Sequence, residues 1–156
     1  MIELTIARHA DAAWGSATQT DHDRPLSAKG RRDAARMATV LQEQSPHACR
    51  VICSTAVRAR DTAAVYAHAL GVALEEDERL YGAEPDALLA VAEGSGTDRI
   101  LLVAHDPGLS SLAFALTGTV TGMPTAAILH LQWASATWAQ ALGRSPDSWS
   151  FDHPSR

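Results

Sequence analysis

The chain opens with IELTIARH (residues 2–9), an apolar run that ends in an arginine and a histidine. Residues 2–7 are mostly apolar and include β-branched side chains, a pattern typical of a strand. Arg8 and His9 would then lie at the carboxyl end of that strand, where open α/β sheets place their ligand sites. A histidine beside a fixed positive charge can bind or attack a phosphoryl group. An isolated Arg-His pair is more often an ordinary solvated strand end, so the rest of the chain must decide.

Two further apolar runs deliver an arginine or a histidine to the start of a helix. ILLVA (residues 100–104) is continuously apolar, as in a central strand buried on both faces, and His105 follows it. A polar aromatic residue has no packing reason to stand there. The short strand at residues 50–53 is followed by STAVRARDTA (residues 54–63), which carries Arg58 into a helix. Each of these side chains therefore stands near a strand-to-helix junction.

Strand and helix patterns alternate along the chain. We expect strands at residues 2–7, 50–53, 72–74 and 100–104, and helices at residues 27–44, 56–70, 85–92 and 109–116. Ser27 would cap the first helix and Pro46 would stop it. Residues 126–132 and 136–142 look like a closing hairpin, and the polar residues 143–156 like a loosely held tail. The alternation predicts an α/β fold, a three-layer sandwich with helices on both faces of a mostly parallel sheet.

Length and composition limit the classes of function. A chain of 156 residues is typical of one domain that can bury a substantial core. Its net charge of −5 argues against a nucleic-acid partner, because binding a phosphate backbone needs a basic face. No apolar run approaches the roughly 20 residues of a membrane helix, and charged residues interrupt any signal-peptide core. We therefore expect a cytoplasmic protein without a membrane partner.

The two cysteines, Cys49 and Cys53, stand at the two ends of one short strand. Opposite ends of a strand are too far apart for a disulfide bond. Further cysteine or histidine ligands at metal-binding spacing are not evident nearby. We interpret both cysteines as buried or half-buried thiols and expect no metal site.

Four motifs in this order resemble the histidine phosphatase superfamily, and specifically its small phosphohistidine phosphatase branch of the SixA type. They are RH (residues 8–9), DRPLS (residues 23–27), STAVRARDTA (residues 54–63) and VAHDPG (residues 103–108). The resemblance covers residues 1 to about 131. It implies a phosphoglycerate mutase-like fold, one histidine phosphatase domain over residues 1–142, and a metal-independent phosphatase that needs no cofactor. Alanine replaces the family's usual glycine at Ala10 and Ala104, and neither change removes a functional group.

The resemblance also implies roles for individual side chains. His9 would be the nucleophile, and Arg8 and Arg58 would bind the phosphoryl oxygens. Because both arginines carry permanent charge, they should also lower the pKa of His9 and keep its imidazole neutral. His105 would donate a hydrogen bond to the transferred phosphoryl group, and Arg24 would lie near the mouth of the pocket. Local sequence alone would instead pair Arg58 with Asp61 on a helix surface.

The general acid is the least defined part of this site. Glu78 lies in about the region where larger members of the superfamily carry a catalytic glutamate, and Asp106 is the next candidate. Alternatively, Glu78 and Asp106 are both surface carboxylates, and no residue of the site acts as general acid. A phosphohistidine needs less protonation of its leaving group than an alkyl phosphate does. The other histidines match no motif and are expected to be solvated or packed: His22, His47, His68, His130 and His153.

The sequence thus favours a phosphatase that works through a phosphohistidine intermediate, with a phosphorylated protein or a small phosphomonoester as substrate. Protein phosphohistidine is the first candidate and a small phosphomonoester the second. A non-catalytic phosphate-binding module is the alternative outside enzymology. The presence of both His9 and His105 favours the enzyme, because a binding module would have no need of a nucleophile.

Overall fold

The computed structural model describes residues 1–44 and 49–154. Pro46, predicted to stop the first helix, and His47 lie outside the described residues. The strands are β1 (Ile2–Arg8), β2 (Arg50–Cys53), β3 (Leu74–Glu76), β4 (Arg99–Ala104), β5 (Ile128–Trp133) and β6 (Ser148–Asp152). The α-helices are α1 (Ala28–Gln44), α2 (Val57–Leu70), α3 (Pro85–Glu93), α4 (Gly108–Thr117) and α5 (Trp138–Leu142). Two short 3-10 helices, η1 (Asp21–Asp23) and η2 (Glu78–Leu80), lie in the connecting loops.

The strands form one six-stranded sheet in the order β3-β2-β4-β1-β5-β6. The pairs β2–β3, β2–β4 and β1–β4 are parallel, whereas β5 and β6 add antiparallel strands beyond β1. Strands β1 and β4 lie in the middle, which explains why both sequences are almost continuously apolar. The predicted mostly parallel sheet is confirmed.

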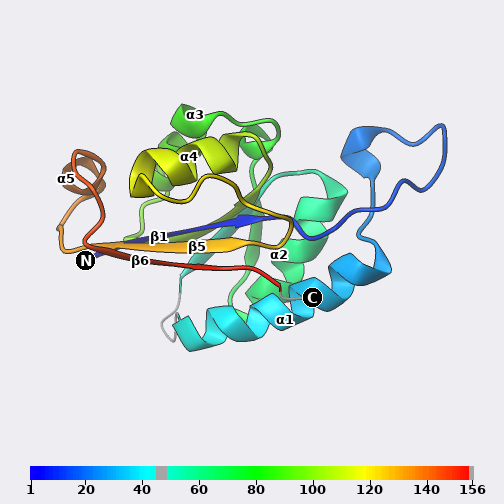
Figure 1. The fold of residues 1–156 in the computed structure, drawn as a ribbon, viewed down its shortest axis with the longest axis horizontal. Helices are drawn as coiled ribbons and strands as arrows, with labels where there is room; N and C mark the ends of the chain where they lie inside the picture. Colours follow the sequence, from blue (N-terminus) through cyan, green and yellow to red (C-terminus); the bar gives the residue numbers. More distant parts are fainter. Residues whose placement is uncertain (45–48, 155–156) are drawn as a thin grey trace.

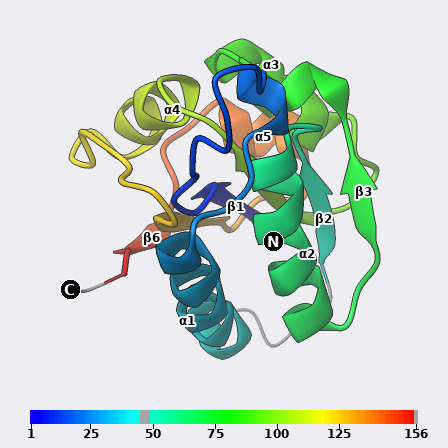
Figure 2. The same ribbon diagram turned by 90° about the vertical axis from the view of Figure 1, so that its right-hand side faces the viewer.

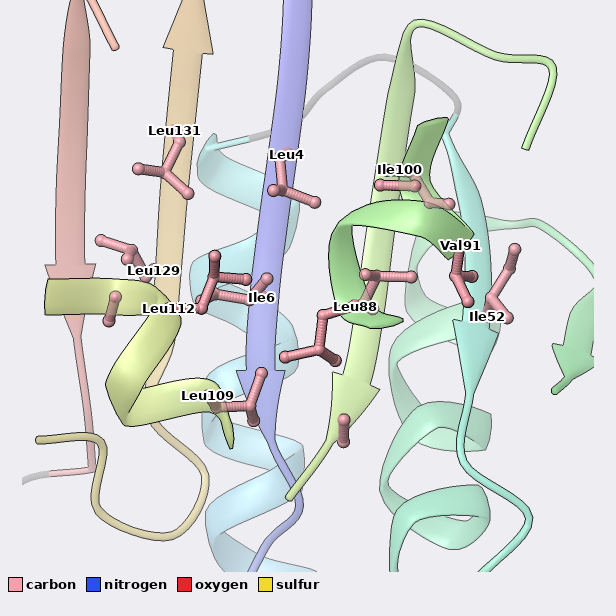
Figure 3. Close-up of a cluster of buried hydrophobic side chains, with 14 of the residues drawn as sticks. Leu4, Ile6, Ile52, Leu88, Val91, Ile100, Leu109, Leu112, Leu129 and Leu131 are labelled. Atoms are coloured by element: carbon pink, nitrogen blue, oxygen red, sulfur yellow. The ribbon is translucent and has the colours of Figure 1, made fainter. Parts of the chain in front are cut away.

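Helices cover both faces of this sheet, so the predicted three-layer α/β sandwich is also confirmed. Helices α1 and α2 lie on one face and α3 and α4 on the other (Figures 1 and 2). Each face has its own core, because alternate residues of a strand point to opposite sides. Leu4 and Ile6 of β1 pack toward Leu88 of α3 and Leu109 of α4 (Figure 3). The second core joins β2 and β4 to α1 and α2, with Tyr66 as its largest side chain.

Local signals account for the helix ends. The Ser27 hydroxyl accepts a hydrogen bond from the Gly30 amide at 2.9 Å, so the predicted cap of α1 is present. Gly71 ends α2 with φ of 70°, a left-handed conformation that suits glycine. Pro85 stands in the first turn of α3, where its missing N–H costs no hydrogen bond.

The C-terminal third of the fold departs from the prediction. Residues 126–132 largely form β5 as expected, but residues 138–142 form the helix α5 and not the second arm of a hairpin. On its side away from β1, strand β5 pairs antiparallel with β6, so residues 148–152 of the predicted polar tail belong to the sheet and are not loosely held. Polar serines alternate with Trp149 and Phe151 in β6, as on a sheet edge. The third strand also begins two residues later than expected, at Leu74.

Candidate active site

Three parallel strands end side by side and bring the predicted residues together. Arg8 at the end of β1 pairs in register with Ala104 at the end of β4, and the His9 amide donates to the Ala104 carbonyl at 3.1 Å. The Ser54 amide, just beyond β2, donates to the Val103 carbonyl at 3.0 Å. His9, Ser54 and the residue that follows Ala104, His105, therefore meet at one edge of the sheet. Figure 2 views the molecule from this end.

The hydrogen bonds of His9 define which ring nitrogen is available for chemistry. Its Nδ1 lies 2.8 Å from the Ala10 carbonyl oxygen, which can only accept, so Nδ1 carries the proton. The Arg58 Nε–H in turn points at the other nitrogen, Nε2, at 3.3 Å. Because a guanidinium can only donate, Nε2 offers a lone pair. His9 is thus a neutral imidazole whose Nε2 faces the arginine, the form that a nucleophile requires.

The surroundings keep His9 neutral. Only 7% of the residue is exposed, and this burial is the largest cause that lowers the pKa of His9, to about 4. The charges of Arg58 and Arg8 lower the pKa further, while the bond to the Ala10 carbonyl raises it. Arginine charge was the cause expected from the sequence. The structure adds burial as the larger one.

This pKa predicts how stability depends on pH. The unfolded chain, with an ordinary histidine pKa of 6.5, binds more protons than the folded chain between pH 4 and 6.5. The free energy of unfolding should therefore fall as the pH drops below 6.5, with His9 contributing a loss of about 2 kcal/mol at pH 5. Urea unfolding at pH 7.5 and pH 5 measures this loss. It should be smaller in His9→Gln and unchanged in His68→Gln, which alters an exposed histidine on α2. Equal losses in wild type and His9→Gln would contradict the prediction.

His105 faces His9 across the site, with ring centroids 5.1 Å apart. Its Nε2 lies 2.8 Å from the Ser54 hydroxyl, and its Nδ1 lies 3.4 Å from Nη2 of Arg58. Burial, and after it the neighbouring His9 and Arg58, lower the pKa of His105 to about 3. The Ser54 hydroxyl can either accept or donate, so it supports both neutral tautomers of His105. Because a guanidinium can only donate, Nδ1 of His105 accepts from Arg58 and Nε2 donates to Ser54 in this structure. In the other tautomer Ser54 donates to Nε2, and a protonated Nδ1 can donate into the site.

Arg58 connects the two histidines from the first turn of α2. The residue is 6% exposed and contacts His9 through Nε and His105 through Nη2. It does not pair with Asp61, so the interpretation of Arg58 as a helix-surface residue is wrong. Its ion-pair partner is Asp21, at 3.0 Å from Nη2. Sequence reasoning did not single out this aspartate.

The other two arginines lie to either side. Nη1 of Arg8 donates to the Met123 carbonyl at 3.0 Å and lies 3.5 Å from the Asp106 carboxylate. Arg24 stacks over the exposed ring of Trp14, with its Cζ 4.0 Å from the ring centroid. Nη1 of Arg24 also lies 3.3 Å from Asp21, so all three arginines surround the same edge of the sheet.

Asp21 and Tyr81 complete the mouth of the site, and neither was predicted. The Tyr81 hydroxyl donates to the Asp21 carboxylate at 2.7 Å, and the Tyr81 ring packs edge-on against His105. His22, which matches no motif, packs against the other side of Tyr81 and bonds the Thr55 hydroxyl at 3.0 Å through Nε2. These residues lie in loops of η1 and η2, where no hydrophobic period marks a position. The only sequence signal was the proximity of Asp21 to the DRPLS motif.

Glu78, the predicted general acid, does not lie against the two histidines. It is exposed on η2, and within the described chain its side chain has no hydrogen bond or ion pair. A cavity of about 280 Å³ beside His105 is lined by Asp106 and Glu84, not by Glu78. The Ser110 hydroxyl donates to the Asp106 carboxyl group and lies 2.8 Å from each of its oxygens.

The described residues contain neither a metal-binding cluster nor a membrane-spanning helix. No group of three or more histidine, cysteine, aspartate or glutamate side chains within residues 1–44 and 49–154 is arranged to hold a metal ion. Across the same residues, none of the helices has the length and apolar character needed to cross a membrane. Cys49 is half-buried and Cys53 buried, both as free thiols, which confirms their predicted state.

The chain is similar to known proteins both in sequence and in fold. The chain is 33% identical over 150 residues to an uncharacterized protein of Mycobacterium tuberculosis, covering 94% of this chain and 92% of the relative. A structure assigned to phosphohistidine phosphatase SixA of Nakamurella multipartitia superposes with a TM-score of 0.79 at 28% identity, covering 98% of this chain and 96% of that one. Its counterpart from Agrobacterium tumefaciens has a TM-score of 0.80 at 23% identity and covers 99% of both chains.

The sequence family agrees with the fold. Residues 4–83, which include Arg8, His9, Arg24, Arg58 and Glu78, match the model of the histidine phosphatase superfamily, branch 1. The six-stranded sheet with helices on both faces is the phosphoglycerate mutase-like fold that the sequence predicted. The chain therefore belongs to the histidine phosphatase superfamily, and it is a phosphatase.

Proposed function

We propose that this phosphatase hydrolyses phosphohistidine on a protein, without a metal ion, in two steps. In the first, Nε2 of His9 attacks the phosphorus, the P–N bond of the substrate breaks, and the leaving imidazole takes a proton from solvent. In the second, water attacks phosphorylated His9, which releases inorganic phosphate and restores the neutral imidazole. Both steps are in-line displacements at phosphorus, so the protein's task is to position the groups and stabilise negative charge.

The phosphoryl group would lie between His9 and the surrounding donors. Arg58 reaches both histidines, at 3.3 Å and 3.4 Å, so a phosphoryl oxygen bound to its guanidinium is also close to both rings. Arg8 and Arg24 would add charge from either side. Once a phosphoryl oxygen replaces Arg58 beside Nδ1 of His105, the Ser54 hydroxyl would donate to Nε2, and Nδ1–H would donate to an equatorial oxygen as charge develops in the transition state. These assignments are also the ones that the sequence resemblance implies.

The state of the carboxyl groups near the site is the observation that favours phosphohistidine over an alkyl phosphate. The hydrogen bond from Tyr81, together with Arg58, lowers the pKa of the Asp21 carboxyl to about 2. Asp106 accepts from Ser110 and lies 3.5 Å from Arg8. Asp21 is therefore held as a base, and Asp106 is already engaged by Ser110 and Arg8, so neither group is well placed to protonate a leaving group. A substrate with a good leaving group, such as imidazole, needs little help of that kind.

Glu78 remains a prediction as the general acid. Its exposed position on η2 does not bring it against the histidines, so it could act only on a leaving group that extends toward it. A small phosphomonoester is the second candidate substrate. The cavity beside His105 supports it, because a volume of about 280 Å³ can hold a small leaving group.

A comparison of substrates tests this proposal. We expect kcat/KM for a phosphohistidine-bearing protein to exceed that for an alkyl phosphate, such as phosphoserine, by about 10²-fold or more, because the alkoxide must be protonated. An aryl phosphate should fall between the two. Each rate should be unchanged in excess EDTA, since charge neutralisation is assigned to arginine. Equal rates on all three substrates would argue against the substrate class, and a loss in EDTA that one added metal restores would argue against the mechanism.

A further inference from the structure

Asp21 occupies the guanidinium of Arg58 from the mouth of the site. Nη2 donates to the Asp21 carboxylate at 3.0 Å, and Nη1 donates to the Asp21 backbone carbonyl at 2.6 Å. The same carboxylate accepts from the Tyr81 hydroxyl at 2.7 Å and from Arg24 at 3.3 Å. An anionic group therefore sits among three donors that surround the proposed phosphate position.

Counting hydrogens shows that Arg58 cannot direct two N–H groups at a second anion while these contacts hold. A guanidinium has five N–H groups. In Arg58, one points to His9, one to the Asp21 carbonyl, one to the Asp21 carboxylate and one to His105, which leaves a single Nη1 hydrogen. A bidentate grip on a phosphoryl group needs two N–H groups directed at its oxygens. Arg58 can form that grip only by giving up at least one of these contacts, and the contacts with Asp21 are the ones in which an anionic residue competes directly with phosphate.

We propose that Asp21 is a built-in competitor of the substrate: its carboxylate occupies Arg58 in the empty enzyme, and a phosphoryl group binds by displacing it. This inference rests on the proposed role of Arg58 in phosphate binding. The contact with Asp21 also gives a guanidinium that is only 6% exposed an anionic partner. A buried charge without a partner is costly, and Asp21 supplies the partner whenever phosphate is absent.

The location of Asp21 allows it to leave without disturbing the core. It belongs to the three-residue helix η1, which contains no buried residue. The loop that carries η1 is fixed at its base, where Ala12 forms a β-bridge with Leu26 and the Ala13 amide donates to Pro25. Displacement of the carboxylate therefore breaks contacts at the mouth of the site, not packing beneath it.

The consequence is a weaker apparent affinity for phosphate, including the product. A ligand that must first displace an internal competitor binds with an affinity reduced by the fraction of molecules in the open state. Asp21 would thus favour release of inorganic phosphate after hydrolysis. Replacing the carboxylate with an amide keeps its shape but removes the charge that competes for Arg58, so phosphate should bind more tightly.

Equilibrium binding of inorganic phosphate to the full chain, measured by calorimetry, tests this inference without turnover. We expect the Kd to fall about tenfold in Asp21→Asn. Asp23→Asn is the matched control, because it removes the same charge two residues away, where the carboxylate lies only against His22 at 3.4 Å. Its Kd should stay within about twofold of wild type. Tyr81→Phe removes a donor that holds the Asp21 carboxylate and should produce a smaller tightening in the same direction.

The sign of the change distinguishes competition from support. If Asp21 merely holds Arg58 in place, Asp21→Asn and Tyr81→Phe will bind phosphate more weakly than wild type, and the inference is wrong. An unchanged Kd in both variants overturns it as well. If neither wild type nor Asp21→Asn binds phosphate, the assignment of Arg58 itself fails, which is a failure of the proposed function. Binding by wild type without tightening in the variants is a failure of the competitor alone.

Discussion

Replacing His9 with alanine should lower kcat/KM by at least about 10³-fold, because it removes the nitrogen that is proposed to attack the phosphorus. The Ala10 carbonyl fixes the proton on Nδ1, so Nε2 is unprotonated and accepts from the Arg58 Nε at 3.3 Å. His105 is assigned a different role, since its Nε2 bonds the Ser54 hydroxyl at 2.8 Å and its Nδ1 lies 3.4 Å from Arg58. Steady-state kinetics on phosphohistidine and on an aryl phosphate would measure the loss.

A matched control separates loss of the nucleophile from loss of a buried imidazole. His130 on β5 is about as buried as His9, at 6% against 7% exposed, but it contacts Thr5 and Glu3 at the opposite side of β1 from β4. His130→Ala should retain activity at temperatures below its Tm. Wild type quenched during turnover should also carry acid-labile, base-stable phosphate that His9→Ala lacks. Near-normal turnover in His9→Ala, or label in that variant, would exclude the covalent mechanism.

The sequence was sufficient to predict the central part of the fold because its signals there are strong and local. Residues 100–104 are apolar without a break, and the structure places them in β4, between β2 and β1. The start of α1 at the Ser27 cap and the end of α2 at Gly71 could also be predicted, because each depends only on residues close by in the sequence. Near the C-terminus the signals are mixed. Residues 138–142 contain both Trp138 and alanines, and tertiary packing of Trp138 and Ala141 into the core settles them as a helix.

The same distinction applies to the site. His9, Arg58 and His105 could be predicted because each follows a recognisable strand, and parallel strands end at one edge of a sheet. Asp21 and Tyr81 could not, because they meet through two loops 60 residues apart in the chain. Pairing between exposed loop residues leaves no period in the sequence. These two loops nevertheless bring Asp21 against Arg58 and Tyr81, a contact that only the three-dimensional structure shows.

Replacing Arg58 with alanine should lower kcat/KM by about 10³-fold, with a rise in KM and a fall in kcat together. The guanidinium would contact the phosphoryl oxygens both before and during the displacement, so its loss affects the ground state and the transition state. Arg60→Ala is the matched control, because it removes the same charge from an exposed position on the same helix.

The split between the two kinetic constants is what tests the role of Arg58. His105→Ala should lower kcat with little change in KM, because its hydrogen bond strengthens only as charge builds on the phosphoryl oxygens. Arg58→Lys, which keeps the charge but loses the planar fork, should recover only part of the activity. If Arg58→Ala left KM unchanged, or if Arg58→Lys matched wild type, the arginine would not be a bidentate phosphate ligand. Its buried contacts with His9, His105 and Asp21 would then serve only to hold the histidines apart and neutral.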